Sequence, residues 1–149
     1  ATVGPFAHCR PDTHIESNAK IGSFVETKCS RIGAHSKVPH LSYIGNTTIE
    51  THCNIGAGTI TCNYNGAQKF PTHIKHHAFI GAGCQLIAPV TIHQGATIGA
   101  GSCLTKDAPA EQLTMSRAPQ RSLHNWQRPQ KPSTADASSE TIPEPAEVS

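Results

Sequence analysis

Aliphatic residues recur at every sixth position from Ile74 to Leu104. They are Ile74, Ile80, Leu86, Ile92, Ile98 and Leu104, and a small residue follows the first five after four places, at Ala78, Cys84, Val90, Ala96 and Ser102. A six-residue period fits neither the turn of an α-helix nor the alternation of a simple strand. It is typical of a hexapeptide-repeat parallel β-helix, in which each unit forms a short strand with a turn and three units close a triangular coil. The pattern therefore predicts an all-β solenoid.

The same pattern extends back towards the start of the chain. Its aliphatic positions there are Ile15, Ile21, Ile32, Val38, Ile44, Ile49 and Ile55, with small partners at Ala19, Val25, Ser36, Ser42, Thr48, Cys53 and Thr59. Two steps are irregular, because eleven residues separate Ile21 from Ile32 and five separate Ile44 from Ile49. The span from Ile15 to Leu104 corresponds to about five coils of about eighteen residues each.

The largest interruption of the repeat lies between Ile60 and Ile74. Residues 61–73 do not follow the period, and we expect them to leave the coil as a loop with Asn65-Gly66 at its tip. Insertions into a repeat array tend to lie on one face, which is often the binding face. The loop is therefore a candidate part of a functional site.

The chain divides into three regions by its pattern and composition. We predict a β-helix over residues 1–108, because the repeat stops after Leu104. Pro109 and Pro119 exclude a long helix in the next segment, residues 109–131. Residues 132–149 are rich in Pro, Ser, Ala and Glu, which predicts a disordered tail.

Composition narrows the class of protein. A hydrophobic content of 36% and an aromatic content of 5% are low for a globular core, but they suffice for a thin column of stacked aliphatics. No apolar run approaches the roughly 18 residues of a membrane helix. The six cysteines form no Cys-x-x-Cys pair, so we expect reduced thiols and a cytoplasmic location. A start without Met or a signal-peptide layout suggests the interior of a longer protein.

The net charge of +2 conceals an uneven distribution. Residues 1–131 carry twelve basic and six acidic side chains, whereas the last eighteen residues carry four acids and no base. A moderately basic body favours anionic small molecules as ligands. We expect no nucleic-acid partner and no insertion into a membrane.

His40 is the first candidate for chemistry. A histidine suits general-base catalysis because its pKa lies near neutrality. Two other readings remain open from the residues alone: a corner histidine facing solvent, or a zinc ligand together with His35. Cations near the interruptions, namely Arg10, Lys28, Lys69 and Arg117, are candidates for binding phosphate or carboxylate groups. The run 54–59 offers backbone N–H groups, either as an oxyanion site or as a plain tight corner.

Two longer segments are more specific than the repeat. Residues 40–45 (His-Leu-Ser-Tyr-Ile-Gly) and 54–66 strongly resemble the acetyltransferase domain of the bifunctional bacterial N-acetylglucosamine-1-phosphate uridyltransferase / glucosamine-1-phosphate acetyltransferase family. Further matches lie at 85–91, 95–98 and 116–120. The resemblance covers roughly residues 4–131. It implies a left-handed parallel β-helix and a homotrimer whose active sites are shared between subunits.

The resemblance also implies an activity. Members of the family transfer acetyl from acetyl-CoA to the amine of glucosamine-1-phosphate, without a metal, on the route to UDP-N-acetylglucosamine and peptidoglycan. His40 matches the catalytic base and Ala57 a backbone donor to the oxyanion. The positions that match sugar-phosphate contacts are Arg10, Lys28, Tyr43, Asn54 and Lys69. Those that match acetyl-CoA contacts are Ala57, Asn63, Tyr64, Ala82, Ala100 and Arg117, and residues 121–131 are expected to pack nearby.

The chain departs from the family pattern in places. Ala82 stands where relatives can carry Ser, which removes one side-chain hydrogen bond to the donor, and Asn65 replaces an Asp common at the loop tip. The uridyltransferase half is absent from the sequence, so we expect no uridylyl transfer. Two alternatives remain: a metal hydratase using His35 and His40, and a non-catalytic trimerisation scaffold.

Overall fold

The computed structural model describes residues 1–133, which form eighteen short strands and no helix. The strands build three sheets in which every pairing is parallel. Sheet A contains β1 (Thr2–Val3), β4 (Lys20–Ser23), β7 (Lys37–His40), β10 (Asn54–Ile55), β13 (Phe79–Ile80), β16 (Thr97–Ile98) and β18 (Leu113–Thr114). Sheet B contains β2 (His8–Cys9), β5 (Glu26–Lys28), β8 (Tyr43–Gly45), β11 (Ile60–Cys62), β14 (Gln85–Ile87) and β17 (Cys103–Leu104). Sheet C contains β3 (Thr13–Ile15), β6 (Ser30–Ile32), β9 (Thr47–Ile49), β12 (Thr72–Ile74) and β15 (Val90–Ile92).

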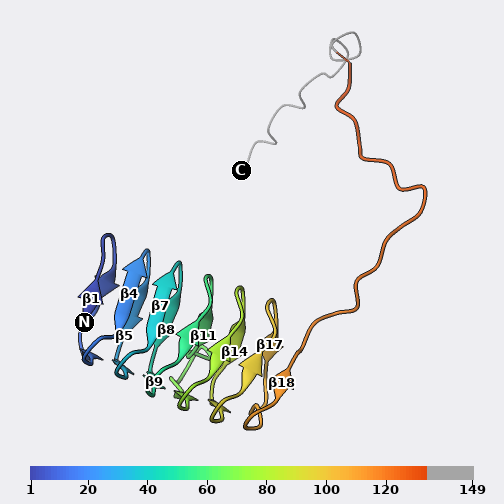
Figure 1. Ribbon diagram of the computed structural model, residues 1–149. Helices are drawn as coiled ribbons and strands as arrows, with labels where there is room; N and C mark the ends of the chain where they lie inside the picture. Colours follow the sequence, from blue (N-terminus) through green and yellow to red (C-terminus); the bar gives the residue numbers. More distant parts are fainter. Residues whose placement is uncertain (134–149) are drawn as a thin grey trace, which may run out of the picture. The chain divides into compact units, whose positions relative to one another are not determined.

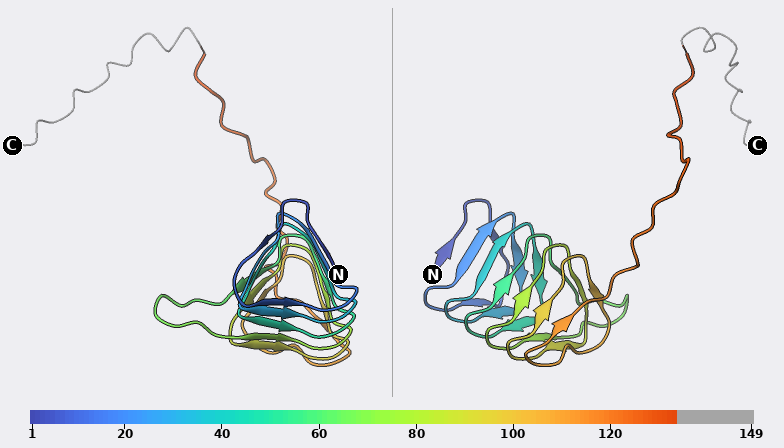
Figure 2. Two further views of the ribbon diagram at one scale, coloured as in Figure 1. Left: turned by 90° about the vertical axis from the view of Figure 1, so that its left-hand side faces the viewer. Right: turned by 45° about the vertical axis from the view of Figure 1, so that its right-hand side comes forward.

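Successive coils stack along one axis (Figure 1), and the view along that axis shows a triangular cross-section (Figure 2). Each complete coil contributes one strand to each sheet, so neighbours in a sheet are three strands apart in the sequence; only β16 and β18 are two apart, because the last coil forms a single bridge at Ala108 in place of a strand in sheet C. The predicted left-handed parallel β-helix is confirmed. No described segment is a helix of the length and hydropathy needed to cross a membrane.

The predicted hydrophobic column forms the core. Every aliphatic position of the repeat from Ile21 to Leu104 is at most 3% exposed, and Ile15 packs partly buried against them. Strand residues two apart face the same side, so each aliphatic shares the interior with the small residue two positions before it. Each fully buried aliphatic contributes about 1.5–3 kcal/mol.

The irregular steps place polar residues in the column. Thr27, within the eleven-residue step, is fully buried where an aliphatic was expected, and its hydroxyl is 3.1 Å from that of Thr13. The prediction of Thr48 as a buried small partner is wrong. Thr47 is buried instead at 2% exposure, whereas Thr48 is only partly buried. A five-residue step shortens the corner by one residue, so the inward position moves back by one.

The loop is shorter than predicted. Thr61 belongs to β11 and is buried at 1% exposure, and Thr72 begins β12. The excursion therefore comprises residues 63–71, which project away from the triangular coils (Figure 2). Thr61 is accommodated because its hydroxyl donates to the carbonyls of Tyr43 and Gly45.

The β-helix continues beyond its predicted end at residue 108. Ala108 is buried and bridges to Ile92, and β18 pairs with β16, so the compact unit reaches Ala118. The aliphatic period is lost there because the inward position of β18 is Thr114, the register partner of Ile98, whereas Leu113 faces outward and is 60% exposed. Residues 119–133 belong to a second unit and contain no strand. Most of the predicted tail, residues 134–149, lies outside the described residues.

Candidate active site

One corner of the triangle gathers five of the predicted site residues. In successive coils, the corner between sheets A and B carries His40, Ala57, Ala82, Ala100 and Arg117. Backbone hydrogen bonds join these corners, from the N–H of Gly58 to His40 (3.4 Å), of Gly83 to Ala57 (2.8 Å) and of Gly101 to Ala82 (2.8 Å). The Arg117 guanidinium donates to the Ala100 carbonyl at 3.3 Å. We call this row the corner column.

The corner column changes character at His40. On its C-terminal side the corner is turned by Gly58, Gly83 and Gly101, whose φ angles of 74°, 69° and 73° favour glycine. In the coil of His40 itself and in the coil before it, Leu41 and Phe24 adopt similar φ values and are 60% and 62% exposed. Three coils therefore present bare backbone, beginning beside His40.

The backbone at this corner has unpaired donors. The N–H groups of Ala57, Ala82 and Ala100 donate no hydrogen bond to another residue of the described chain, because it is the following glycine that bonds across the coils. Unpaired, fixed N–H groups can donate to a carbonyl oxygen or to an oxyanion. The imidazole of His40 is exposed and makes no side-chain hydrogen bond within residues 1–133.

A second group lies on the outer face of sheet B and at the base of the loop. Arg10 Nη1 is 2.9 Å from Glu26 Oε1. The neighbouring Lys69 lowers the pKa of Lys28 most strongly, and the charge of Arg10 adds a weaker effect of the same sign. Neither lysine has an acidic partner among the described residues. Two unbalanced cations side by side favour binding of a phosphate group.

Tyr43 and Asn63 lie beside these cations. The Asn63 amide donates to Tyr43 Oη at 3.5 Å and to Asn46 Oδ1 at 2.7 Å, and Asn63 is only 7% exposed. Gly45 makes the approach possible, since a Cβ there would lie 2.5 Å from Tyr43 Oη and 2.7 Å from Asn63 Nδ2.

Two predicted residues lie apart from both groups. Asn54 lies in β10 of sheet A, in register with Lys37 and Phe79. Tyr64 is 60% exposed on the loop, where its hydroxyl donates to the Gly66 carbonyl at 2.6 Å. Within one chain, the predicted site is therefore divided among the corner column, sheet B with the loop, and sheet A.

The geometry of the two-histidine zinc site is contradicted. His35 precedes β7 and His40 ends it, so the two lie at opposite ends of one strand, on successive corners. His35 stacks instead on His52, with ring centroids 4.8 Å apart, and His52 stacks on His77 at 5.1 Å. No group of three or more metal-binding side chains occurs among the described residues. The spacing of these histidines by whole coils was a signal that the sequence analysis missed.

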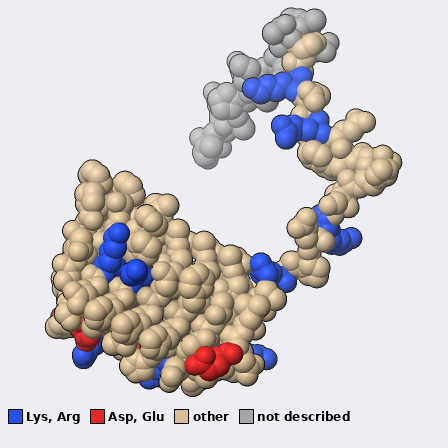
Figure 3. Space-filling model, in the orientation of Figure 1, with Lys and Arg blue, Asp and Glu red and all other residues tan. Residues whose placement is uncertain are grey.

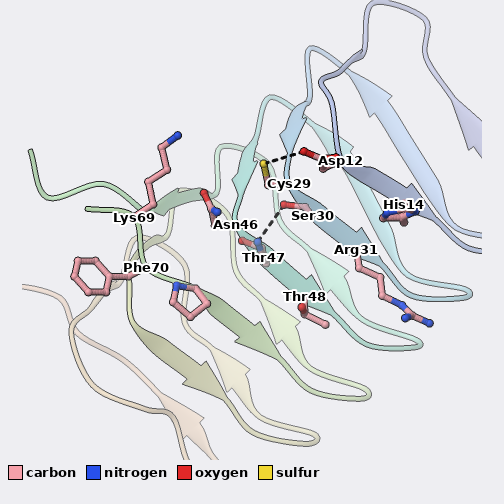
Figure 4. A pocket seen from close by; sticks show the side chains of 11 residues that line it. Asp12, His14, Cys29, Ser30, Arg31, Asn46, Thr47, Thr48, Lys69 and Phe70 are labelled. Atoms are coloured by element: carbon pink, nitrogen blue, oxygen red, sulfur yellow. Dashed lines mark hydrogen bonds between the residues drawn. The ribbon is translucent and has the colours of Figure 1, made fainter. Parts of the chain in front are cut away.

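A hollow of about 410 Å³ lies beneath the base of the loop, against sheet C (Figure 4). Asp12, His14 and Arg31 line one side, and Lys69 and Phe70 line the other. The Arg31 guanidinium forms an ion pair with Glu16 and donates a hydrogen bond to its carboxylate. This bond and a second one from the Ala34 N–H lower the pKa of Glu16. Lys69 belongs both to this hollow and to the group of cations on sheet B. The sequence analysis did not foresee this hollow.

A basic patch lies over β4 and β7 (Figure 3), where Lys20 and Lys37 are register partners and exposed. These lysines were not among the predicted site residues, and they extend the basic character of the body to sheet A.

Known proteins resemble the chain in sequence. The family profile described as "Bacterial transferase hexapeptide (six repeats)" matches residues 71–106. Bifunctional protein GlmU from Cupriavidus pinatubonensis is 57% identical over 129 residues, covering 87% of this chain and 28% of that protein. Its counterpart from Alkalilimnicola ehrlichii is 56% identical over 137 residues, covering 91% and 30%. The chain spans less than a third of the length of either relative.

Solved structures share the architecture. A GDP-perosamine N-acetyltransferase mutant from Caulobacter crescentus, in complex with CoA and GDP-perosamine, superposes with a TM-score of 0.67 at 20% identity, covering 74% of this chain and 50% of that one. The acetyltransferase domain of PglB from Neisseria gonorrhoeae, in complex with acetyl coenzyme A, gives 0.66 at 18% identity, covering 74% and 52%. These likenesses show the fold. The sequence matches, by contrast, identify the chain as a hexapeptide-repeat transferase homologous to one segment of the bifunctional GlmU proteins.

Proposed function

We propose that the chain is an acetyl-CoA-dependent N-acetyltransferase that converts glucosamine-1-phosphate into N-acetylglucosamine-1-phosphate, for UDP-N-acetylglucosamine and cell-wall synthesis. The observation that carries the proposal is the corner column, where exposed His40 borders bare backbone and the Ala57 N–H is unpaired within residues 1–133. Aminolysis of a thioester needs a base and an oxyanion donor. Sequence identity to GlmU proteins and the CoA in both structural neighbours support the choice of reaction.

The corner column binds acetyl-CoA, and the residues of sheet B and the loop bind the amino sugar. Acetyl-CoA lies along the corner column, with its acetyl group beside Ala57 and a phosphate near Arg117. Lys28 and Lys69 bind the sugar phosphate because their like charges are otherwise unbalanced. Tyr43, held beside Asn63, and Arg10 complete the contacts of the acceptor.

The transfer proceeds by direct attack. His40 removes a proton from the ammonium of the amino sugar, and the freed lone pair forms a C–N bond to the thioester carbonyl carbon. The Ala57 N–H stabilises the oxyanion of the tetrahedral adduct. The adduct loses a second proton from nitrogen as the C–S bond breaks, CoA leaves as the thiol, and His40 returns its proton to solvent.

The proposal includes a cytoplasmic homotrimer. Asn54 and Tyr64 lie away from the groups that they would serve within one chain, which favours a site completed by a neighbouring subunit.

A thiol-release assay tests the reaction. We expect CoA release to require glucosamine-1-phosphate, not glucosamine, and to fall by about 10²–10⁴-fold in His40→Ala. His93→Ala is the matched control, because His93 is exposed after β15 and, within residues 1–133, makes hydrogen bonds only through its backbone, to Ala108 and Ala96. Wild-type turnover in His40→Ala would exclude His40 as the base. Trimers that fail to bind acetyl-CoA in calorimetry would instead indicate a scaffold.

A further inference from the structure

Both ends of the loop formed by residues 63–71 are attached to one residue, Asn46. Its side-chain Oδ1 accepts a hydrogen bond of 2.7 Å from Nδ2 of Asn63, where the loop begins. Its backbone carbonyl accepts one of 3.1 Å from the N–H of Thr72, where the chain re-enters sheet C. Its own N–H donates to the carbonyl of Lys28 at 3.0 Å. One residue thus joins the start of the loop, its end and the coil beneath it.

The corner conformation suits asparagine. Asn46 connects β8 to β9 with a φ of 49°, in the left-handed region that asparagine enters more readily than most residues. Cys29 and Asp12 turn the same corner in the two preceding coils, with φ values of 47° and 61°. Figure 4 shows Asn46 between that corner and the loop base that carries Lys69. In the next coil the loop replaces this corner altogether.

The bond from Asn63 to Asn46 also fixes the surroundings of the acceptor. The Asn63 amide that bonds to Asn46 is 3.5 Å from Tyr43 Oη. Asn63 is nearly buried, and both its amide and the Tyr43 hydroxyl pack closely against Gly45. A shift of the Asn63 amide therefore displaces the Tyr43 hydroxyl. Beyond Asn63, the loop returns through Lys69, since the Phe70 N–H bonds to the Asn63 carbonyl at 2.8 Å.

We infer that Asn46 is a positioning residue for the acceptor: through Asn63 it holds Tyr43 and Lys69 in place for the phosphorylated sugar, without touching the sugar itself. The inference rests on the proposed acetyl transfer for its kinetic consequence. Its structural consequence, the anchoring of residues 63–71, is independent of any activity.

The test uses Asn46→Gly, which removes the side chain while keeping the left-handed corner free of strain. Hydrogen–deuterium exchange of peptides covering 63–71 should become about tenfold faster, since an anchored segment opens more often when its anchor is lost. In the thiol-release assay, the KM for glucosamine-1-phosphate should rise about tenfold while the KM for acetyl-CoA stays within about twofold, because only the acceptor contacts are displaced. Asn46→Asp retains a carboxylate acceptor for Asn63 and should recover most of both losses.

Asn18→Gly is the matched control, because Asn18 is exposed and turns a different corner with a φ of 58°. It should leave loop exchange and both KM values unchanged. Unaltered loop exchange in Asn46→Gly, or equal rises of the two KM values, would overturn the inference. If exchange accelerates and Asn46→Asp reverses it, but the wild-type protein releases no CoA thiol, the anchor stands and the proposed acetyl transfer fails.

Discussion

At the scale of single residues, polar side chains inside the column are tolerated where they find partners. Buried Ser30 bonds to the carbonyls of Lys28 and Ile44, and Ser36 bonds to that of Glu50. Thr72 is different, since its buried hydroxyl has no hydrogen-bond partner among the described residues. In the adjacent coils its place is taken by Thr47 and Val90.

Thr72→Val should therefore stabilise the fold. Valine has the same shape and removes an unsatisfied buried hydroxyl, so the free energy of unfolding should rise by about 1 kcal/mol. Urea denaturation measures the change. Thr47→Val is the control, because the Thr47 hydroxyl donates to the Gly45 carbonyl at 2.9 Å, and this variant should be no more stable than the wild type. A destabilised Thr72→Val would contradict the assignment of an unpaired hydroxyl.

At the scale of elements, ion pairs join neighbouring coils at the corner between sheets C and A. Glu50, which follows β9, accepts hydrogen bonds from Lys75 Nζ at 2.9 Å and from the His76 N–H at 3.1 Å, beyond β12. Burial alone would raise the pKa of Glu50, but Lys75 and His76 together hold it below the usual 4.5. The carboxylate thus links the two coils that the loop separates in sequence.

This link predicts the response to acid. A carboxyl with a lowered pKa in the folded state contributes its stability above the unfolded value, and the contribution is lost as pH falls through the folded pKa. The melting temperature of the wild type should therefore fall below about pH 4.5. Glu50→Gln should be less stable at pH 7 by about 0.5–1 kcal/mol, since all three partners are partly exposed.

Thermal melts at intervals between pH 7 and pH 3 measure the difference. The gap between wild type and Glu50→Gln should narrow as the pH falls below 4.5. A constant gap over the whole range would show that the carboxylate charge of Glu50 contributes nothing to stability.

At the scale of the whole molecule, mixed assemblies test the proposal that a neighbouring subunit completes each site. His40→Ala and Tyr64→Ala should each be inactive as pure proteins. Trimers reassembled from equal amounts of both variants should regain up to about a quarter of wild-type activity if each site takes His40 from one subunit and Tyr64 from its neighbour. No recovery in verified mixed trimers would place both residues in a single subunit's site.

Much of the fold and part of the site follow from the sequence. The six-residue period assigns nearly every core position, because the inward direction of a short strand depends only on residues close in the chain. The repeat also implies the corner column, since His40, Ala57 and Ala82 each stand two residues after an aliphatic position of the period. The assignment of core positions fails where a step is irregular. At Thr27 a polar residue takes the place of an aliphatic in the column, and at Thr48 a five-residue step moves the inward position back to Thr47.

Only the tertiary structure decided which residues meet across coils. Coil length varies between Ile32, Ile49, Ile74 and Ile92, so side-by-side neighbours cannot be derived from one fixed spacing. That variation hides from the sequence the stack of His35, His52 and His77 and the pairing of Lys69 with Lys28. It also attaches both ends of the loop to Asn46. The sequence by itself determined the solenoid and its interior, since these depend on a local repeat, whereas the packing of one coil on the next determined the site.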